Sequence, residues 1–383
     1  MSAPARTLRA ERPANSLSAG PPPGEQTPPP SDPRAIGPLP ADHPTVRRRS
    51  VGLLVINLGT PDAPRPWAVK DYLAQFLSDR RVVELPAIVW KPLLHGVVLN
   101  TRPRKSARAY AAIWDHQRGD SPLRAITGDI AAALAGEFPQ VRVEMAMRYG
   151  KPAILPAILR LREAGCERIL IAPLYPQYCG ATTASAIDEV CRALQQFRWQ
   201  PAIRTLPPWY DDPAYIAALR ESLLDGLDAL DFAPEAVLAS FHGMPQRTLD
   251  RGDPYHCQCV KTTRLLREAL GWDEDRLRLT FQSRFGAGAW LKPYTDETLA
   301  ALPGQGVKRV AVIAPGFTAD CLETLEELAI RGREQFLEAG GEHFAYIPCL
   351  NDSTHGIALL RHLVARELAG WVELPQAALS AGI

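Results

Sequence analysis

Short apolar runs, each ended by glycine or proline, alternate along most of the chain with longer segments of mixed polarity. Their length and continuous apolar character are typical of strands that are buried on both faces of a parallel sheet. The predicted strands cover residues 51–57, 141–147, 168–173, 236–240 and 278–282, and the predicted helices between and after them cover residues 67–77, 153–164, 262–270 and 354–371. This alternation predicts βαβ units and an α/β fold with doubly wound parallel sheets.

The second half of the chain repeats the plan of the first. The segment K-R-V-A-V-I-A-P from Lys308 closely matches E-R-I-L-I-A-P from Glu167, and a loop and a helix follow each. The hydroxyls of Thr182, Thr183 and Ser185 are suited to capping the first of these helices. The repetition predicts two similar Rossmann-like domains that face each other across a cleft.

The predicted divisions of the chain are a Pro-rich disordered tail over residues 1–48, domains over 49–205 and 206–353, and a closing helix and tail over 354–383. Residues 1–48 contain too few apolar side chains to offset the entropy lost on ordering.

Composition narrows the class of protein. With 43 basic and 42 acidic residues among 383, the net charge is +1, which points to neither nucleic acid nor an acidic partner. No apolar run approaches the ~18 residues of a membrane-spanning helix, and the N-terminus lacks the apolar core of a secretory signal. We therefore predict a cytoplasmic protein. Its seven scattered cysteines indicate free thiols, and the pair Cys257 and Cys259 is only a weak metal-binding signal.

His242 stands where the run A-V-L-A-S-F ends before G-M-P. In open α/β sheets, ligands bind outside the carboxyl ends of the strands. A histidine there acts as a base or a metal ligand near neutral pH, or is an ordinary loop histidine with its hydrogen bonds satisfied.

A second candidate group follows the repeated strand. Asp320 and Glu323 open a predicted helix, and Glu327 lies on the same face as Glu323. Asp320 and Glu323 fit a capping box. Alternatively, Glu323 faces the same crevice as His242, and the two form a pair suited to Fe(II) and to proton transfer.

The apolar segment 85–99 runs directly into a basic cluster of Arg102, Arg104, Lys105 and Arg108. One interpretation is a core helix followed by a solvated turn. The other is a hydrophobic lip whose cations receive the carboxylates of an apolar substrate or anionic lipid headgroups.

Several separated motifs, in the same order, resemble the ferrochelatase family. They are L-L-V-I-N-L-G-T-P, R-P-R-K-S-A-R-A-Y, M-R-Y-G-K-P, P-L-Y-P-Q-Y, S-F-H-G-M-P, R-G-D-P-Y, F-Q-S-R-F-G, W-L-K-P, P-G-F-T-A-D-C-L-E-T-L-E-E and L-N-D-S. The resemblance covers residues 51–371 and is to the bacterial type. It implies a chelatase-like fold and a lyase that inserts Fe(II) into protoporphyrin IX, the last step of haem biosynthesis.

By this resemblance His242 is the active-site histidine and Glu323 its partner carboxylate, and both contact the metal. Glu327 is the next acid along the helix and is implied to conduct metal or protons. Further residues match positions that meet the propionates or the ring, or that form the pocket wall: Arg102, Lys105, Tyr110, Leu58, Arg148, Tyr149, Trp290 and Phe317. Apolar walls that contact the rim of the porphyrin can bend the ring, which opens one face to the metal. A base on that face takes the pyrrole protons as the metal enters.

The chain departs from animal members of the family at several positions. Cys321 stands where they carry a second histidine, Gly180 replaces a cluster ligand, and the C-terminus has no cysteine. We therefore predict no animal-type [2Fe–2S] cluster and no permanently bound cofactor. Some bacterial members use internal cysteines, which keeps Cys257 and Cys259 open as ligands.

Alternative functions remain open at this point. They are a coproporphyrin III ferrochelatase, a cobalt chelatase of the same fold and a non-catalytic haem- or porphyrin-binding protein. The resemblance also allows a monomer or a homodimer, and peripheral contact of the lip, residues 85–108, with the inner membrane.

Overall fold

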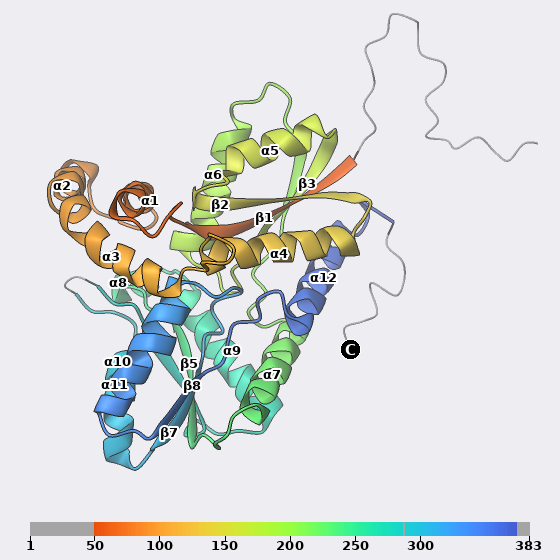
Figure 1. Ribbon diagram of the computed structural model, residues 1–383. Helices are drawn as coiled ribbons and strands as arrows, with labels where there is room; N and C mark the ends of the chain where they lie inside the picture. The colour runs from red at the N-terminus through yellow and green to blue at the C-terminus, as the bar shows by residue number, and fades with distance from the viewer. Residues whose placement is uncertain (1–49, 286–287, 374–383) are drawn as a thin grey trace, which may run out of the picture. The chain divides into compact units, whose positions relative to one another are not determined.

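The computed structural model describes residues 50–285 and 288–373, and contains two four-stranded parallel sheets (Figure 1). The first has the order β2-β1-β3-β4 and the second the order β6-β5-β7-β8. Their strands are β1 (Ser50–Thr60), β2 (Val141–Gly150), β3 (Cys166–Pro173), β4 (Ala202–Thr205), β5 (Ala236–His242), β6 (Leu277–Gln282), β7 (Arg309–Ile313) and β8 (His343–Tyr346). The repeated segments form β3 and β7, which occupy equivalent places, and the predicted α/β class is confirmed.

Helices connect the strands of each sheet. With the first sheet lie α1 (Pro66–Ser78), α2 (Ala87–Leu93), the π-helix η1 (Leu94–Val98), α3 (Leu99–Ile113), α4 (Pro122–Glu137), α5 (Ile154–Glu163), the π-turn η2 (Gly180–Ala184) and α6 (Ser185–Leu194). With the second lie α7 (Pro213–Asp228), α8 (Gln246–Asp250), α9 (Tyr255–Leu270), α10 (Thr295–Ala301), the 3-10 helix η3 (Leu302–Gln305), the π-helix η4 (Glu323–Gly332) and α11 (Arg333–Glu338). The last helix, α12 (Thr354–Leu368), packs against α7 and returns to α4 and β3 of the first half.

Local sequence explains where three of the long helices begin. Ser121, Asp212 and Ser353 each accept a backbone N–H two or three residues ahead, at the starts of α4, α7 and α12. Proline follows Ser121 and Asp212 at the first helical position, where its missing N–H costs nothing.

One apolar core joins the two sheets. It includes Leu53 of β1 and Val237 of β5, both fully buried, together with Leu363 of α12. The Thr318 hydroxyl, beyond β7, donates to the Leu174 carbonyl beyond β3 over 2.9 Å. The described residues from Ser50 onward accordingly form one compact unit, and the predicted division near residue 205 stays a prediction. The predicted tail, residues 1–48, lies outside the described residues.

The predicted capping by Thr182, Thr183 and Ser185 is wrong. The turn η2 leads directly into α6, which has no side-chain cap. The Ser185 hydroxyl instead donates to the Asp79 carboxylate over 2.6 Å, because α6 packs beside the end of α1.

Candidate active site

His242 is the last residue of β5, which lies between β6 and β7 in the second sheet. The chain leaves β5 for one neighbour and later returns to the other, so His242 stands at a topological switch point, where α/β proteins bind ligands. Its side chain is half-buried, and Nδ1 lies 2.7 Å from the carbonyl oxygen of Gly243. In the tautomer that makes this bond Nδ1–H donates, and Nε2 keeps its lone pair for a proton or a metal.

Gln282 links His242 to Glu323. It pairs with His242 across β5 and β6, and its Nε2 donates to the backbone carbonyl of Glu323 over 2.7 Å. The Ser240 hydroxyl donates to the other end of the same amide over 2.7 Å. The buried glutamine therefore ties the start of η4 to the strand end that carries the histidine, and brings the two predicted residues to one place.

Glu323 begins a π-helix rather than the predicted α-helix. Runs of π-helix are rare and concentrate at functional sites. The predicted capping box is also wrong, because the buried Asp320 carboxylate accepts hydrogen bonds from the Thr324 and Tyr346 hydroxyls and from the Asn351 amide. The Glu323 carboxylate is half-buried, and its charge also acts on groups outside the helix.

Those groups come from α1 and α3. Burial raises the pKa of Tyr110, and the charge of Glu323 raises it further. The Arg102 side chain is exposed as a whole, but partial desolvation of its guanidinium lowers its pKa, and the charge of Glu323 opposes that change. The Tyr72 ring meets Tyr110 edge-on, with the two centroids 6.4 Å apart. Glu323 therefore acts on residues of α1 and α3 that stand more than 200 positions earlier in the chain.

Glu327, one turn further along η4, accepts two hydrogen bonds from Ser283. The Ser283 N–H lies 2.8 Å from one carboxylate oxygen and its hydroxyl 2.5 Å from the other. Burial raises the pKa of Glu327 overall, although the Ser283 bonds and the charges of His242 and Arg331 oppose the rise. His242, Glu323 and Glu327 thus form one electrostatically linked group.

The stretch from α2 through η1 to the start of α3 has an exposed apolar face and a buried anchor. Ile88, Val89 and Val97 are 86%, 61% and 52% exposed, whereas Leu94 and Leu99 are buried. The prediction of a simple core helix is therefore wrong, and the exposed face fits a hydrophobic lip. In the described part of the chain, no helix is long and apolar enough to cross a membrane.

Two cations expected to meet porphyrin carboxylates, Arg102 and Lys105, are exposed on α3. The Arg102 guanidinium lies over the Phe285 ring, 5.2 Å from its centroid. Phe285 in turn lies 5.0 Å from Trp290, an expected wall residue. This stack connects α3 to the segment that follows β6.

The other expected wall residues fall into two groups. Leu58 and Phe317 pack against the same small cluster of Leu123, Ala319 and Cys321. Tyr110, Arg148 and Tyr149 lie farther inside, and the last two bond the Asp79 carboxylate rather than standing free.

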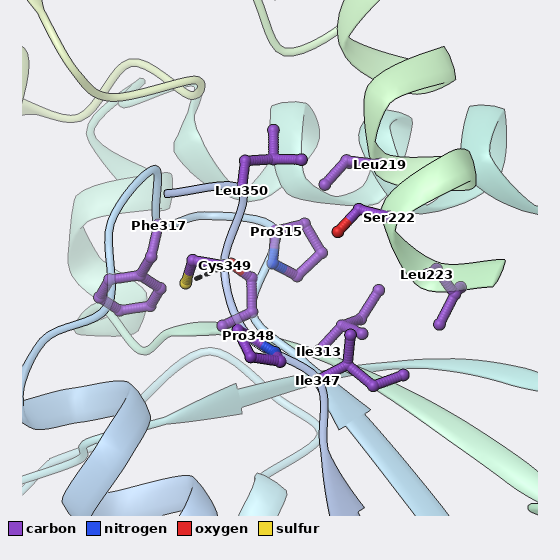
Figure 2. Close-up of a pocket in the computed structure, with 11 residues that line it drawn as sticks. Leu219, Ser222, Leu223, Ile313, Pro315, Phe317, Ile347, Pro348, Cys349 and Leu350 are labelled. Carbon is purple, nitrogen blue, oxygen red and sulfur yellow. Dashed lines mark hydrogen bonds between the residues drawn. The ribbon is translucent and has the colours of Figure 1, made fainter. Parts of the chain in front are cut away.

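A cavity of about 20 Å³, room for one water molecule, lies behind Phe317 (Figure 2). Figure 2 shows Leu219, Ser222 and Leu223 of α7 on one side and Cys349 on the other. Neither His242 nor Glu323 lines it, so it is not the site of the chemistry.

All seven cysteines are free. Cys257 is exposed and Cys259 is buried, because residues two apart on α9 point to opposite sides. The two therefore do not form a common site. Within residues 50–285 and 288–373, no group of three or more histidine, cysteine, aspartate or glutamate side chains is arranged to hold a metal.

The sequence analysis did not identify Gln282, Ser283 or Asp79 as parts of the site. The first two belong to the F-Q-S-R-F-G motif directly after a predicted strand, the same kind of position that singled out His242. Asp79 follows α1 with no comparable signal.

Two parallel sheets of matching order, with a histidine and two acids gathered at the strand ends of one of them, define a chelatase-like α/β protein. The fold is similar to that of SirB from Bacillus subtilis with Fe3+, with a TM-score of 0.51, 13% identity and coverage of 84% of this chain and 97% of that one. The ferrochelatase family model matches residues 50–368, and the chain belongs to that family. As a member it is a lyase that inserts iron into porphyrin for haem synthesis.

Curated ferrochelatases match the sequence of this chain along nearly their whole length. The ferrochelatase of Rhizobium meliloti is 56% identical over 334 residues, which cover 86% of this chain and 98% of that protein. The ferrochelatase of Agrobacterium fabrum is 54% identical, and the match covers 87% of this chain and 98% of that protein. The ferrochelatase of Methylocella silvestris is 52% identical, and the match covers 86% of this chain and 97% of that protein.

Proposed function

We propose that the enzyme inserts Fe(II) into protoporphyrin IX and that His242 accepts the pyrrole protons and contacts the metal. The observation that carries this proposal is the 2.7 Å contact between Nδ1 and the Gly243 carbonyl, which leaves Nε2 as an acceptor at the end of β5. The porphyrin loses two N–H protons as Fe(II) enters, so the step needs a neutral base close to the ring nitrogens.

Glu323 assists by delivering the metal or by removing protons, and Glu327 lies on the delivery path. A neutral imidazole beside carboxylates is a donor set that suits Fe(II). The link from His242 through Gln282 to Glu323 supports this role, because it keeps the acid beside the base.

Arg102 and Lys105 bind the propionates, and Leu58, Tyr110, Trp290 and Phe317 hold the ring. Arg148 and Tyr149 complete the wall and are anchored from behind by Asp79. In this scheme residues 49–205 supply the lip and most of the wall. Residues 206–353 supply the histidine, the acids and the wall residues Trp290 and Phe317, and the helix that begins at Thr354 closes the fold.

The test is anaerobic absorbance spectroscopy of the purified protein with Fe(II) or Zn(II) and protoporphyrin IX. His242→Ala should reduce the rate ~100-fold or more, the usual effect of losing a general base. His343→Ala is the matched control, because His343 is exposed on β8 and should leave the rate unchanged.

Other outcomes would change the assignment. Faster conversion of coproporphyrin III than of protoporphyrin IX would make coproporphyrin III the substrate. Preferential insertion of cobalt would make cobalt, rather than Fe(II), the metal. Porphyrin binding without conversion by the wild type would contradict the chelatase reaction itself.

We also propose that the enzyme works in the cytoplasm with its lip in peripheral contact with the inner membrane. Exposed Ile88, Val89 and Val97 lie on α2 and η1, just before the exposed cations Arg102, Arg104 and Lys105 of α3. Apolar side chains beside cations favour the surface of an anionic bilayer.

Co-sedimentation with phosphatidylglycerol and phosphatidylcholine vesicles tests this contact. Ile88→Asp with Val89→Asp should abolish binding to the anionic vesicles, whereas Val260→Asp, on the exposed side of α9, should not. If the variant instead lowers the molecular mass in sedimentation and leaves vesicle binding intact, the lip joins two copies in a homodimer.

A further inference from the structure

Ser283 adopts a backbone conformation that serine normally avoids. Among the described residues, only Ser283 and Asn351 are non-glycines with positive φ, at 64° and 50°. For an L residue this region brings Cβ close to the following carbonyl oxygen. Asn351 bonds Asp320 just before η4, and Ser283 bonds Glu327 within it. Both residues with positive φ therefore bond an acid that lies in η4 or three residues before it.

The conformation of Ser283 directs both of its donors at one carboxylate. The N–H reaches one oxygen of Glu327 and the hydroxyl reaches the other, at 2.8 Å and 2.5 Å. Glycine would adopt this backbone more easily but would lose the hydroxyl bond. The geometry thus favours a residue that fixes the orientation of the Glu327 carboxylate.

The loop has other anchors besides these bonds. The next residue, Arg284, pairs with Asp296 and Glu297 on α10, at 2.9 Å and 2.8 Å. The preceding residue, Gln282, is held in β6 and by Ser240. Ser283 therefore stands between two independent anchors, and its side chain is available to act on Glu327.

The same two consecutive residues control both acids of η4. Gln282 holds the backbone of Glu323, and Ser283 holds the carboxylate of Glu327. Gln282 ends β6, the strand paired with the one that ends in His242, and Ser283 follows it directly. The spacing of the two acids from the histidine is therefore set by the end of β6 as well as by the helix.

We propose that Ser283 is a positioning residue that holds the Glu327 carboxylate in the orientation from which metal passes toward His242. This inference rests on the proposed role of Glu327 in delivery. Loss of the Ser283 hydroxyl leaves the carboxylate free to rotate away, so metal capture weakens while porphyrin binding is unaffected.

Steady-state insertion of Zn(II) into protoporphyrin IX, followed by fluorescence, tests the inference. Ser283→Ala should raise the KM for Zn(II) about tenfold, the effect of losing a hydrogen bond to a charged group, and leave the KM for porphyrin unchanged. Ser283→Gly should give the same KM change with an equal or higher unfolding temperature, because it relieves the backbone. Glu327→Gln should raise the KM for Zn(II), and adding Ser283→Ala to it should have no further effect.

Ser50→Ala is the matched control, since it removes a serine hydroxyl that bonds the Ala164 carbonyl at the start of β1, and should leave both KM values unchanged. Equal increases in the two KM values, or additive effects of Ser283→Ala and Glu327→Gln, would show a merely structural serine and overturn the inference. If Glu327→Gln leaves the KM for Zn(II) unchanged, the proposed role of Glu327 is wrong and the inference falls with it. If Glu327→Gln raises the KM for Zn(II) but Ser283→Ala and Ser283→Gly do not, the role of Glu327 stands and only the inference about Ser283 is wrong.

Discussion

The Arg148 guanidinium lies 2.6 Å from the Asp79 carboxylate, and the two side chains are only 11% and 10% exposed. The same carboxylate oxygen accepts hydrogen bonds from the Tyr149 and Ser185 hydroxyls, at 2.8 Å and 2.6 Å. Asp79 follows α1, whereas Arg148 and Tyr149 lie near the end of β2. The network therefore fixes the end of α1 to β2 of the first sheet. Arg148 is already paired with a carboxylate of the protein itself.

Asp79→Asn should lower the free energy of unfolding by about 3–5 kcal/mol, because it leaves the buried Arg148 charge without its partner. Urea denaturation measures the change. Asp188→Asn breaks the exposed pair with Arg81, whose side chains are 48% and 44% exposed, and should cost less than about 1 kcal/mol. Equal losses in the two variants would contradict a special role for the buried pair.

The contribution of Asp79 should also disappear in acid. Burial opposes its ionisation, but hydrogen bonds from Ser185, the Arg81 backbone and Tyr149 and the charge of Arg148 together lower its pKa below the usual 3.8. Because the folded pKa lies below the unfolded one, the ionised carboxylate stabilises the fold above that value, and the contribution is lost as pH falls through the folded pKa. The stability difference between wild type and Asp79→Asn should be constant from about pH 5 to 7 and should shrink below about pH 4. A difference that stays unchanged in acid would assign the effect to packing.

Gly243→Ala should reduce both stability and metal insertion. A Cβ at this position would lie 2.6 Å from the Gln282 carbonyl oxygen, so the strand ends that hold His242 and Gln282 would have to separate. Overpacking of this kind costs about 1–3 kcal/mol. Gly304→Ala in η3 is the control, because its Cβ would meet nothing within 4 Å. Thermal unfolding and the Zn(II) insertion rate are the measurements, and an active Gly243→Ala enzyme would show that His242 tolerates displacement.

Arg102→Ala should raise the KM for protoporphyrin IX about tenfold, because a charge-assisted bond to a propionate is lost. The KM for Zn(II) should change little. Arg264→Ala removes an equally exposed arginine, paired with Glu268 on α9, and should leave both values unchanged. A change confined to the KM for metal would instead connect Arg102 with Glu323.

The sequence alone was sufficient to predict the repetition, the end of β5 and the strands at the centre of each sheet, but it missed the short strands β4 and β8 at the sheet edges. Residues 51–57 and 236–240 form continuous apolar runs that can only be buried, and the turn residues after them mark where each strand ends. The position of His242 at a strand end follows from that local pattern. The motif order then identified the family, because many separated segments had to agree at once.

The tertiary structure alone decided which groups surround the candidate catalytic residues. The bonds from Gln282 and Ser283 to η4 join residues 41 and 44 positions apart, and the pair of Arg148 with Asp79 joins residues 69 apart. No local pattern encodes such contacts, because they depend on how two sheets and their helices pack. The π-helix at Glu323 and the positive φ of Ser283 are likewise unfavourable locally and persist only because neighbouring elements hold them. The sequence thus determined where the candidate chemistry stands in the fold, and packing decided which neighbours orient it.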